Sequence, residues 1–249
     1  MAPTNATCER FTEEAMKTRK SARVKARNDS ERLTEIERRL REAHGQPRHH
    51  NPSDPLDDLI FLVLSRMTQQ TKYLRTFEAL TARYSSWELV RDAPSSEVEE
   101  VLSDAGLAPT KTAHIQAILK EVERREGAID LSRLHQLPDL EAEQYLTSLP
   151  GVSRKTARCV MLYALERQTC PVDTHVWRIM QRLGFAPAGP WSERASRELE
   201  GRIPAALRRS LHVTLIAHGR LICRARRPAC EPCVLRPLCP SARPTAPPS

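Results

Sequence analysis

The sequence predicts an all-helical protein. Apolar residues recur at helical spacing, as at Leu33, Ile36 and Leu40, and no alternating run of β-branched residues bounded by turns is present. Glycine is scarce, with 8 residues in 249, and aromatic residues make up only 4% of the chain. A chain of this length can form one large domain or two modest domains with hydrophobic cores.

Capping residues and helix breakers set the expected helix boundaries. A first helix is expected over 30–43, ending near Gly45. Asp54 followed by Pro55 is typical of an N-cap and first helical residue, and opens a largely apolar helix that reaches Leu64. Further helices are expected at 70–84, at 86–93 with a capping-box pattern of Ser85 and Glu88, at 96–104, from Thr110, at 139–148, after Pro150-Gly151, from Asp173 or Thr174, at 192–201 and at 207–221.

The two ends of the chain differ in composition from the rest. Residues 1–29 are basic and poor in apolar side chains, which predicts a flexible arm, and residues 241–249 are a proline-rich disordered tail. The N-terminus lacks the apolar segment of a signal peptide, and no window approaches 18 apolar residues. We therefore expect a soluble protein of the cytoplasm or nucleoid, with no membrane partner.

The net charge of +8 favours a polyanionic partner, and nucleic acid is the usual one. Charge alone is a weak signal, because a basic surface also serves solubility. Three histidines, His44, His49 and His50, lie in one polar segment. A surface loop is the favoured interpretation of that segment, because no acidic or cysteine partner stands at metal-ligand spacing.

The most informative stretch is Leu149-Pro-Gly-Val-Ser-Arg-Lys-Thr-Ala157. A helix that starts after a Pro-Gly turn presents unpaired N–H groups and the positive end of its dipole, which suits a phosphate. Gly151 lets the backbone approach closely, Ser153 is the expected N-cap, and Arg154 adds charge. With the helix 139–148 this stretch forms a helix-hairpin-helix, which binds DNA backbone without reading sequence. An ordinary capped core helix is the alternative.

Lysine usage draws attention to Lys155. The chain has 32 arginines and seven lysines, and Lys155 is the one lysine in the last 129 residues. A guanidinium cannot be deprotonated, so a lysine kept in such a chain is a candidate nucleophile that attacks a sugar C1′. Asp173 lies eighteen residues further on. It is either the N-cap of the next helix or a catalytic carboxylate.

Four of the seven cysteines cluster near the C-terminus, as Cys223, Cys230, Cys233 and Cys239 in the spacing C-x6-C-x2-C-x5-C. In an intracellular chain this clustering favours metal binding over disulfides. Zinc and an iron–sulfur cluster both suit four thiolates, although zinc sites usually pair two short C-x2–4-C knuckles and only one is present. Arg224 and Arg227 lie among the cysteines and can offer cations to phosphates.

Together these motifs closely resemble endonuclease III, the iron–sulfur member of the helix-hairpin-helix DNA glycosylases. The resemblance covers roughly residues 30–240 and rests on the hairpin, on Val172-Asp-Thr-His175, on His218-Gly-Arg-Leu-Ile-Cys223 and on the cysteine spacing. It implies a six-helix domain over 57–167 and a cluster domain made of 30–56 with 168–240, flanking a DNA-binding cleft.

The resemblance also implies the chemistry. Lys155 would be the Schiff-base nucleophile and Asp173 the carboxylate that activates it or stabilises the sugar cation. The four cysteines would hold a [4Fe-4S] cluster, and the backbone of the hairpin and His175 would contact DNA. The implied activity removes an oxidised pyrimidine from duplex DNA and nicks the abasic site by β-elimination. Many relatives act as monomers, and we expect the same of this chain.

Two loops are expected to fill the space left by a flipped base. The first is Gly106-Leu107-Ala108-Pro109, which resembles a Gly-Leu loop of the family and implies that Leu107 is the wedge. The other is Leu64-Ser-Arg-Met-Thr-Gln-Gln-Thr71, where relatives usually show a Gln-x-Thr segment. Without a gap Arg66 takes the glutamine's place, whereas a gap assigns Gln69; we favour Arg66.

Two other interpretations compete. The adenine-excising, monofunctional branch shares the hairpin, the aspartate and the cluster, but it generally lacks the lysine and carries a large C-terminal domain. Only ten residues follow Cys239 in this sequence. A non-catalytic DNA-binding module is the third possibility, and the presence of both Lys155 and Asp173 argues against it.

Overall fold

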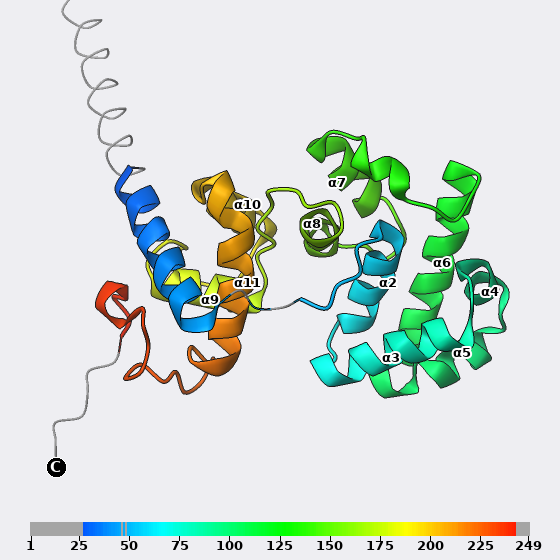
Figure 1. Cartoon of the computed structure of the whole chain (residues 1–249), viewed down its shortest axis with the longest axis horizontal. Coiled ribbons are helices and arrows are strands. Elements are labelled where there is room, and N and C mark those ends of the chain that lie inside the picture. The colour runs from blue at the N-terminus through cyan, green and yellow to red at the C-terminus, as the bar shows by residue number, and fades with distance from the viewer. Residues whose placement is uncertain (1–26, 46, 48, 243–249) are drawn as a thin grey trace, which may run out of the picture. The chain divides into compact units, whose positions relative to one another are not determined.

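The structure is a computed structural model that describes residues 27–45, 47 and 49–242 (Figure 1). Within these residues it contains helices and no strand, as the sequence predicts. The chain divides into two compact units, Arg48–Pro171 and the combination of Met1–Pro47 with Val172–Ser249. None of the described helices is long and apolar enough to span a membrane. Most of the expected arm and tail lies outside the described residues.

The unit of residues 48–171 is built around α2 (Pro55–Ser65). Asp54 caps this helix as predicted, because its side chain accepts hydrogen bonds from the backbone N–H groups of Leu56 and Asp57. The remaining elements of the unit are α3 (Gln70–Arg83), α4 (Trp87–Asp92), α5 (Ser95–Val101), η1 (Ser103–Ala105), α6 (Ala108–Glu126), η2 (Ser132–His135), α7 (Asp139–Thr147) and α8 (Arg154–Tyr163).

The core of this unit lies where α2 packs against α3, α6 and α8. Ile60, Leu64, Ile115, Leu119 and Val160 are fully buried there. Burial of each such side chain contributes roughly 1.5–3 kcal/mol to folding. This packing fixes α6 and α8, the two helices that carry most of the candidate site in this unit.

Local details differ from the expected boundaries. Ser86, and not Ser85, is the N-cap of α4, and Glu88 interacts with the Ser86 side chain. The helix expected at 96–104 divides at Leu102 into α5 and η1. α6 begins at Ala108 and not at Thr110, because Leu107 turns the chain in a left-handed conformation directly into the helix.

The boundary between the units lies before residue 48, whereas the resemblance implied that 30–56 would join the C-terminal residues. Two contacts hold residues 49–54 to α2 and α8. The amide of Asn51 donates to Asp58 Oδ1 at 2.6 Å, and the ring of His49 packs on Tyr163 with centroids 4.8 Å apart.

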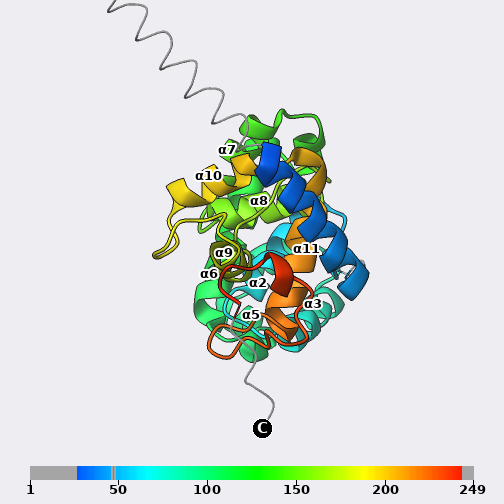
Figure 2. The same cartoon turned by 90° about the vertical axis from the view of Figure 1, so that its left-hand side faces the viewer.

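The second unit contains a helix over 27–44, α9 (Thr174–Arg182), α10 (Glu193–Arg202), α11 (Ala205–Leu221) and a cysteine-containing loop with η3 (Arg236–Leu238). Figures 1 and 2 both show the helix 27–44 beside α11. Glu37 accepts a hydrogen bond from Ser210, and His44 Nε2 lies 3.0 Å from His218 Nδ1. His44 therefore packs on α11 and does not belong to a surface loop.

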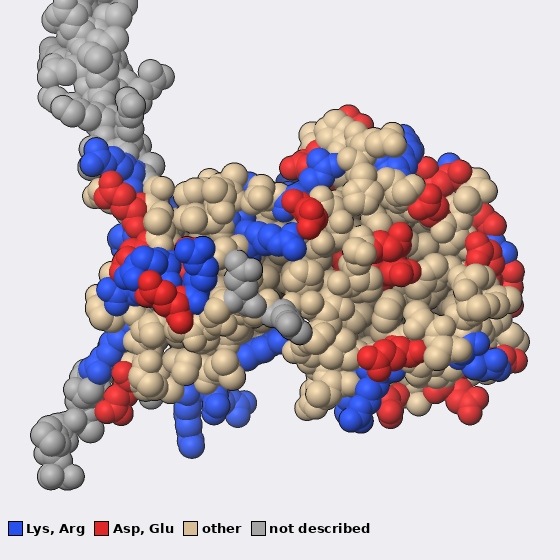
Figure 3. Space-filling view, in the orientation of Figure 1, with Lys and Arg blue, Asp and Glu red and all other residues tan. Residues whose placement is uncertain are grey.

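The helix 27–44 carries many charged side chains. Figure 3 shows basic and acidic side chains intermixed on the side of this helix that faces the viewer. Arg38 pairs with Glu35 and Glu42, and Arg39 also pairs with Glu35. These pairs lower the pKa of Glu35 to about 2. The basic charge of this helix is therefore largely matched by its own carboxylates.

Candidate active site and nucleic-acid interface

The hairpin between α7 and α8 has the expected form. Leu149 and Val152 are buried, and the Val152 N–H donates to the Leu149 carbonyl at 3.2 Å. Gly151 is exposed between them with a φ of +71°. The Ser153 hydroxyl accepts from the Thr156 N–H and caps α8, as the sequence predicts. The turn thus leads into the positive end of a capped helix.

α6 supports the hairpin from the side. A Cβ atom at position 151 would lie 2.7 Å from the ring of His114, a half-buried residue of α6. Glycine is therefore required at Gly151 for two reasons, the positive φ and the close approach of the ring. No local pattern singles out His114, because it lies 37 positions before Gly151.

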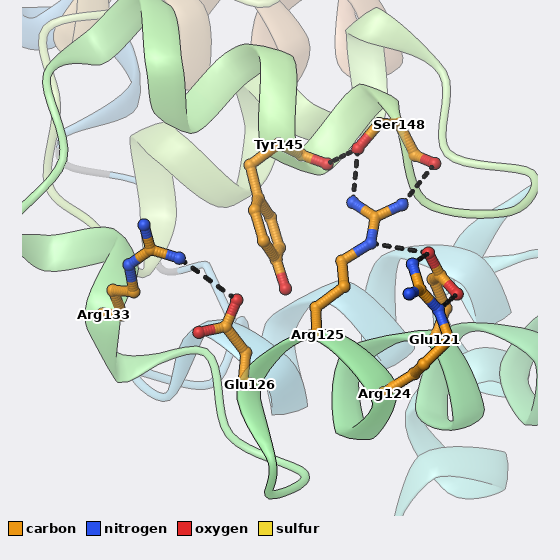
Figure 4. Close-up of polar contacts among 7 residues, drawn as sticks. All are labelled: Glu121, Arg124, Arg125, Glu126, Arg133, Tyr145 and Ser148. Carbon is orange, nitrogen blue, oxygen red and sulfur yellow. Dashed lines mark hydrogen bonds and ion pairs between the residues drawn. The ribbon is translucent and has the colours of Figure 1, made fainter.

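A second contact joins the C-terminal ends of α6 and α7 (Figure 4). Arg125 donates to the Ser148 hydroxyl at 2.6 Å and to the Ser148 carbonyl at 3.3 Å, and its Nε donates to Glu121. Tyr145 points toward Glu126 in Figure 4, and burial, followed by this carboxylate, raises the pKa of Tyr145. The residue just before the hairpin is therefore held by α6.

Lys155 lies in the first turn of α8 and is exposed. Its neighbours Arg154 and Arg158 both pair with Glu143 of α7, at 2.6 and 2.8 Å. These pairs brace the two helices of the hairpin against each other. Arg154 was expected to contact DNA, and the structure directs its Nε onto Glu143.

The loop between α2 and α3 approaches the hairpin through Arg66, whose Nη1 donates to the Gly151 carbonyl at 3.2 Å. Gln69 is exposed and is the N-cap of α3. The side chain that stands out from this loop is Met67, which is 93% exposed with a φ of +53°. The sequence did not predict a role for Met67, because only Arg66 and Gln69 were candidates for the place of the family's glutamine.

The second expected loop presents Leu107. This side chain is 55% exposed, its φ is +55°, and it is the N-cap of α6. A non-glycine residue in this backbone region costs about 1 kcal/mol or more, and such strain is concentrated at functional sites. Met67 and Leu107 thus share an exposed apolar side chain and a left-handed backbone.

In the other unit, Asp173 is the N-cap of α9. Its Oδ1 accepts from the N–H groups of His175 and Val176, at 2.9 and 2.8 Å. The capping interpretation is therefore confirmed, and a catalytic role must come in addition to it. The side chain is half-buried.

His175 is also half-buried in this unit, and burial lowers its pKa. Its Nδ1 lies 3.1 Å from Arg178 Nη2. A Cβ atom at position 219 would lie only 2.6 Å from His175 Nδ1, so α11 needs Gly219 where it meets α9. Arg178 continues the contact to the cysteine-containing loop by donating to the Cys223 carbonyl at 2.9 and 3.0 Å.

The four clustered cysteines line one cavity together with Arg182 and Arg236. Arg182 Nη1 lies 3.0 Å from Cys223 Sγ, and His218 Nε2 lies 3.4 Å from Cys233 Sγ. Burial raises the pKa of the Cys233 and Cys239 thiols. Cys159 and Cys170 are buried and do not line this cavity.

This donor set fits a soft metal centre held by four thiolates. Among the described residues, no three His, Cys, Asp or Glu side chains are placed to bind a single metal ion. The side chains of Arg224 and Arg227 are exposed on the same loop. Arg182 donates to the carbonyls of Arg224 and Ala225, at 2.9 and 2.8 Å, which orders the start of the loop.

Each unit thus assembles its own part of the candidate site. Residues 48–171 bring together the hairpin residues, Lys155 and Arg66, with Met67 and Leu107 on the neighbouring loops. The other unit brings Asp173 and His175 onto the helix that also holds the cysteine-containing loop.

Comparison with known proteins gives a consistent picture. Residues 62–205 match the family described as HhH-GPD superfamily base excision DNA repair protein. Endonuclease III of Synechocystis sp. is 33% identical over 191 residues, which cover 76% of this chain and 82% of that protein. A relative from Arabidopsis thaliana is 31% identical over 177 residues; the match covers 71% of this chain and 60% of the relative, so this chain spans less than two thirds of it.

Solved structures show the same similarity. A non-covalent complex of endonuclease III with DNA superimposes with a TM-score of 0.73 at 25% identity, covering 85% of this chain and 95% of that chain. A trapped covalent intermediate of endonuclease III with DNA gives a TM-score of 0.70 at 28% identity, covering 84% and 93%.

Proposed function

Because the chain belongs to the endonuclease III family of base-excision DNA repair glycosylases, we propose that it is a bifunctional enzyme that removes oxidised pyrimidines and nicks the resulting abasic site. The observation that carries the second activity is the position of Lys155, exposed in the first turn of a helix that directly follows the hairpin. A duplex with a damaged base or an abasic site is the proposed partner.

The proposed reaction begins with the neutral amine of Lys155. Its electron pair attacks C1′ of the flipped nucleotide, a C–N bond forms, and the glycosidic bond breaks as the base leaves with that bond's electrons and takes up a proton. Opening of the sugar ring gives an imine. Loss of the C2′ proton to water then forms the C2′–C3′ double bond and expels the 3′ phosphate, and hydrolysis of the imine releases Lys155.

Asp173 is the proposed carboxylate partner of this reaction. It accepts the proton of the Lys155 ammonium or stabilises the cationic sugar. Its Oδ1 is occupied by two backbone N–H groups, so the carboxylate is held in one orientation by the helix that it caps. Capping and catalysis are therefore compatible in one side chain.

The hairpin is the proposed seat of a DNA phosphate. The first turn of α8 offers backbone N–H groups, and Gly151 leaves space for a close approach. Met67 and Leu107 are the proposed wedges, because apolar side chains that stand out from the surface can replace a base in the stack. Arg66 then supports the hairpin from its position on the Gly151 carbonyl.

Borohydride trapping tests the lyase. Wild-type protein is incubated with duplexes that carry thymine glycol, dihydrouracil or an abasic site, and a covalent adduct is expected with each. Lys155→Gln is expected to lose the adduct and the nicking while it still binds DNA, whereas Lys120→Gln, an exposed lysine of α6, retains both. Base release without any adduct would instead indicate a monofunctional enzyme.

We also propose that Cys223, Cys230, Cys233 and Cys239 hold a [4Fe-4S] cluster. Such a cluster would fold the loop around four Fe–S bonds, so that Arg224 and Arg227 are presented to phosphates. The four thiols that line one cavity support this proposal.

Elemental analysis of anaerobically purified protein tests the cofactor. About four irons per chain are expected for one such cluster. Cys230→Ser is expected to lose iron, whereas Cys159→Ala, a buried cysteine outside the cavity, retains it. Stoichiometric zinc without iron would refute the cluster and leave the lyase proposal intact.

A further inference from the structure

Lys111, near the start of α6, is a buried cation. Only 3% of the residue is exposed, although lysine is almost never buried without a partner. Its ammonium nitrogen lies 2.7 Å from the Leu64 carbonyl, 2.6 Å from the Thr68 hydroxyl and 2.8 Å from the Ala105 carbonyl. An ammonium has three N–H donors, and each of them meets one oxygen.

These three oxygens belong to the bases of two loops. Leu64 lies in the last turn of α2, just before the loop that carries Met67, and Thr68 lies in that loop. Ala105 precedes the Gly106–Leu107 turn. The Thr68 hydroxyl also lies within hydrogen-bond distance of the Ala105 carbonyl. Lys111 and Thr68 together therefore join the two loops directly below their exposed apolar side chains.

The chemistry of the contact suits lysine and not arginine. The three acceptors surround one nitrogen, which matches a compact ammonium, whereas the planar guanidinium spreads its donors over a fork. This choice stands out in a chain with 32 arginines and seven lysines. The hydrogen-bond partners of Lys111 are neutral oxygens, and burial, with a smaller effect of Arg66, lowers the pKa of Lys111 to about 8.

We propose that Lys111 is a positioning residue that locks the two loops together, so that Met67 and Leu107 enter the DNA duplex as one preformed element when the target base leaves the stack. This inference rests on the proposed function, because it assigns a task within base extrusion. Its physical basis is preorganisation: two loops that are already fixed lose less conformational freedom on binding than two independent loops.

The test compares two substrates. The first is a duplex with thymine glycol, which requires base extrusion, and the second is a single-stranded abasic oligonucleotide, which offers Lys155 a sugar but has no stack to fill. Lys111→Met is expected to reduce kcat/KM for base release from the duplex by about tenfold or more. Borohydride trapping on the single strand is expected to stay within about threefold of wild type.

The matched control is Lys120→Met, an exposed lysine on the same helix, which is expected to leave both substrates unchanged. Thr68→Val is a second variant for the case in which Lys111→Met does not fold, because it removes one acceptor and leaves the ammonium two others. It is expected to give the same pattern with a smaller loss on the duplex.

Hydrogen exchange provides a readout besides activity. In Lys111→Met, backbone exchange is expected to accelerate in residues 65–69 and 103–107, while the hairpin 149–153 exchanges as in wild type. Folded Lys111→Met protein that processes the duplex normally, or that loses both substrates equally, would overturn the inference. Wild-type protein that is inert on both substrates would refute the proposed function, and the exchange measurement would still decide whether Lys111 locks the loops.

Discussion

The imidazole ring of His114 on α6 lies against the backbone of Gly151, so closely that a Cβ atom at position 151 would come within 2.7 Å of the ring. This contact sets the position of the hairpin relative to α6. Through Arg125 the same helix holds the residue before the hairpin. Through Lys111 it holds the two loops that carry the exposed side chains of Met67 and Leu107. One helix thus supports three elements of the candidate DNA-binding surface in its unit.

Replacement of Gly151 should weaken DNA binding. In Gly151→Ala the new methyl group meets His114, and the φ of +71° adds about 1 kcal/mol of backbone strain. The double variant Gly151→Ala with His114→Ala should recover part of the affinity, because it removes the clash but not the strain. Fluorescence anisotropy with a labelled abasic duplex measures both. An equal affinity of the single and double variants would mean that the ring does not constrain the hairpin.

Two glycines in helices should respond oppositely to alanine. Gly219→Ala places a Cβ atom 2.6 Å from His175 Nδ1 and 3.1 Å from Arg178 Nη2, so we expect a loss of about 1–3 kcal/mol in the free energy of unfolding. A Cβ atom at Gly201 of α10 would have nothing within 4 Å, and Gly201→Ala should gain roughly 0.5 kcal/mol from helix propensity. Urea unfolding distinguishes the two, and stabilisation by both changes would contradict the close packing of α9 on α11.

Substitutions at Asp173 can separate its capping role from its proposed catalytic role. Asparagine caps helices about as well as aspartate, so Asp173→Asn should change the free energy of unfolding by less than about 0.5 kcal/mol, whereas Asp173→Ala should lose about 1 kcal/mol. Both variants should lose base release by at least about a hundredfold if the carboxylate takes part in the reaction. Normal activity of Asp173→Asn would leave Asp173 with a capping role alone.

Asp58 should make stability depend on pH. Burial, as the largest cause, raises the pKa of this side chain to about 8, and its Oδ2 has no hydrogen-bond partner. The folded state therefore holds the proton more tightly than the unfolded state. The stabilisation is complete below the unfolded pKa near 4 and is lost as the pH rises toward 8, by about 1.4 kcal/mol per pH unit at most.

Asp58→Asn removes this titration while keeping an acceptor for Asn51. The variant should be more stable than wild type at pH 8, and this advantage should shrink toward pH 4. Urea unfolding at both pH values provides the measurement, with Asp104→Asn, on the exposed surface of η1, as the control. A stability difference that does not change with pH would place the Asp58 pKa in its ordinary range.

Local sequence determined where most of the helices lie, several of their caps and the chemical identity of the candidate residues. Asp54, Ser153 and Asp173 cap helices because a capping side chain bonds N–H groups two or three positions away. The cysteines are recognisable for the same reason, since their spacing places four thiols in one short loop. Features that depend only on residues a few positions apart can be predicted directly from the amino-acid sequence.

Tertiary packing decided which side chains stand out from the surface and which support them. Arg66 turns to the hairpin carbonyl and leaves Met67 exposed, a choice that depends on Gly151, 85 positions away. Lys111 and His114 are ordinary residues of an amphipathic helix in the sequence, and their partners come from loops that only the packing of α6 brings near. Contacts between distant segments depend on the summed packing of a whole unit, so no local pattern announces them.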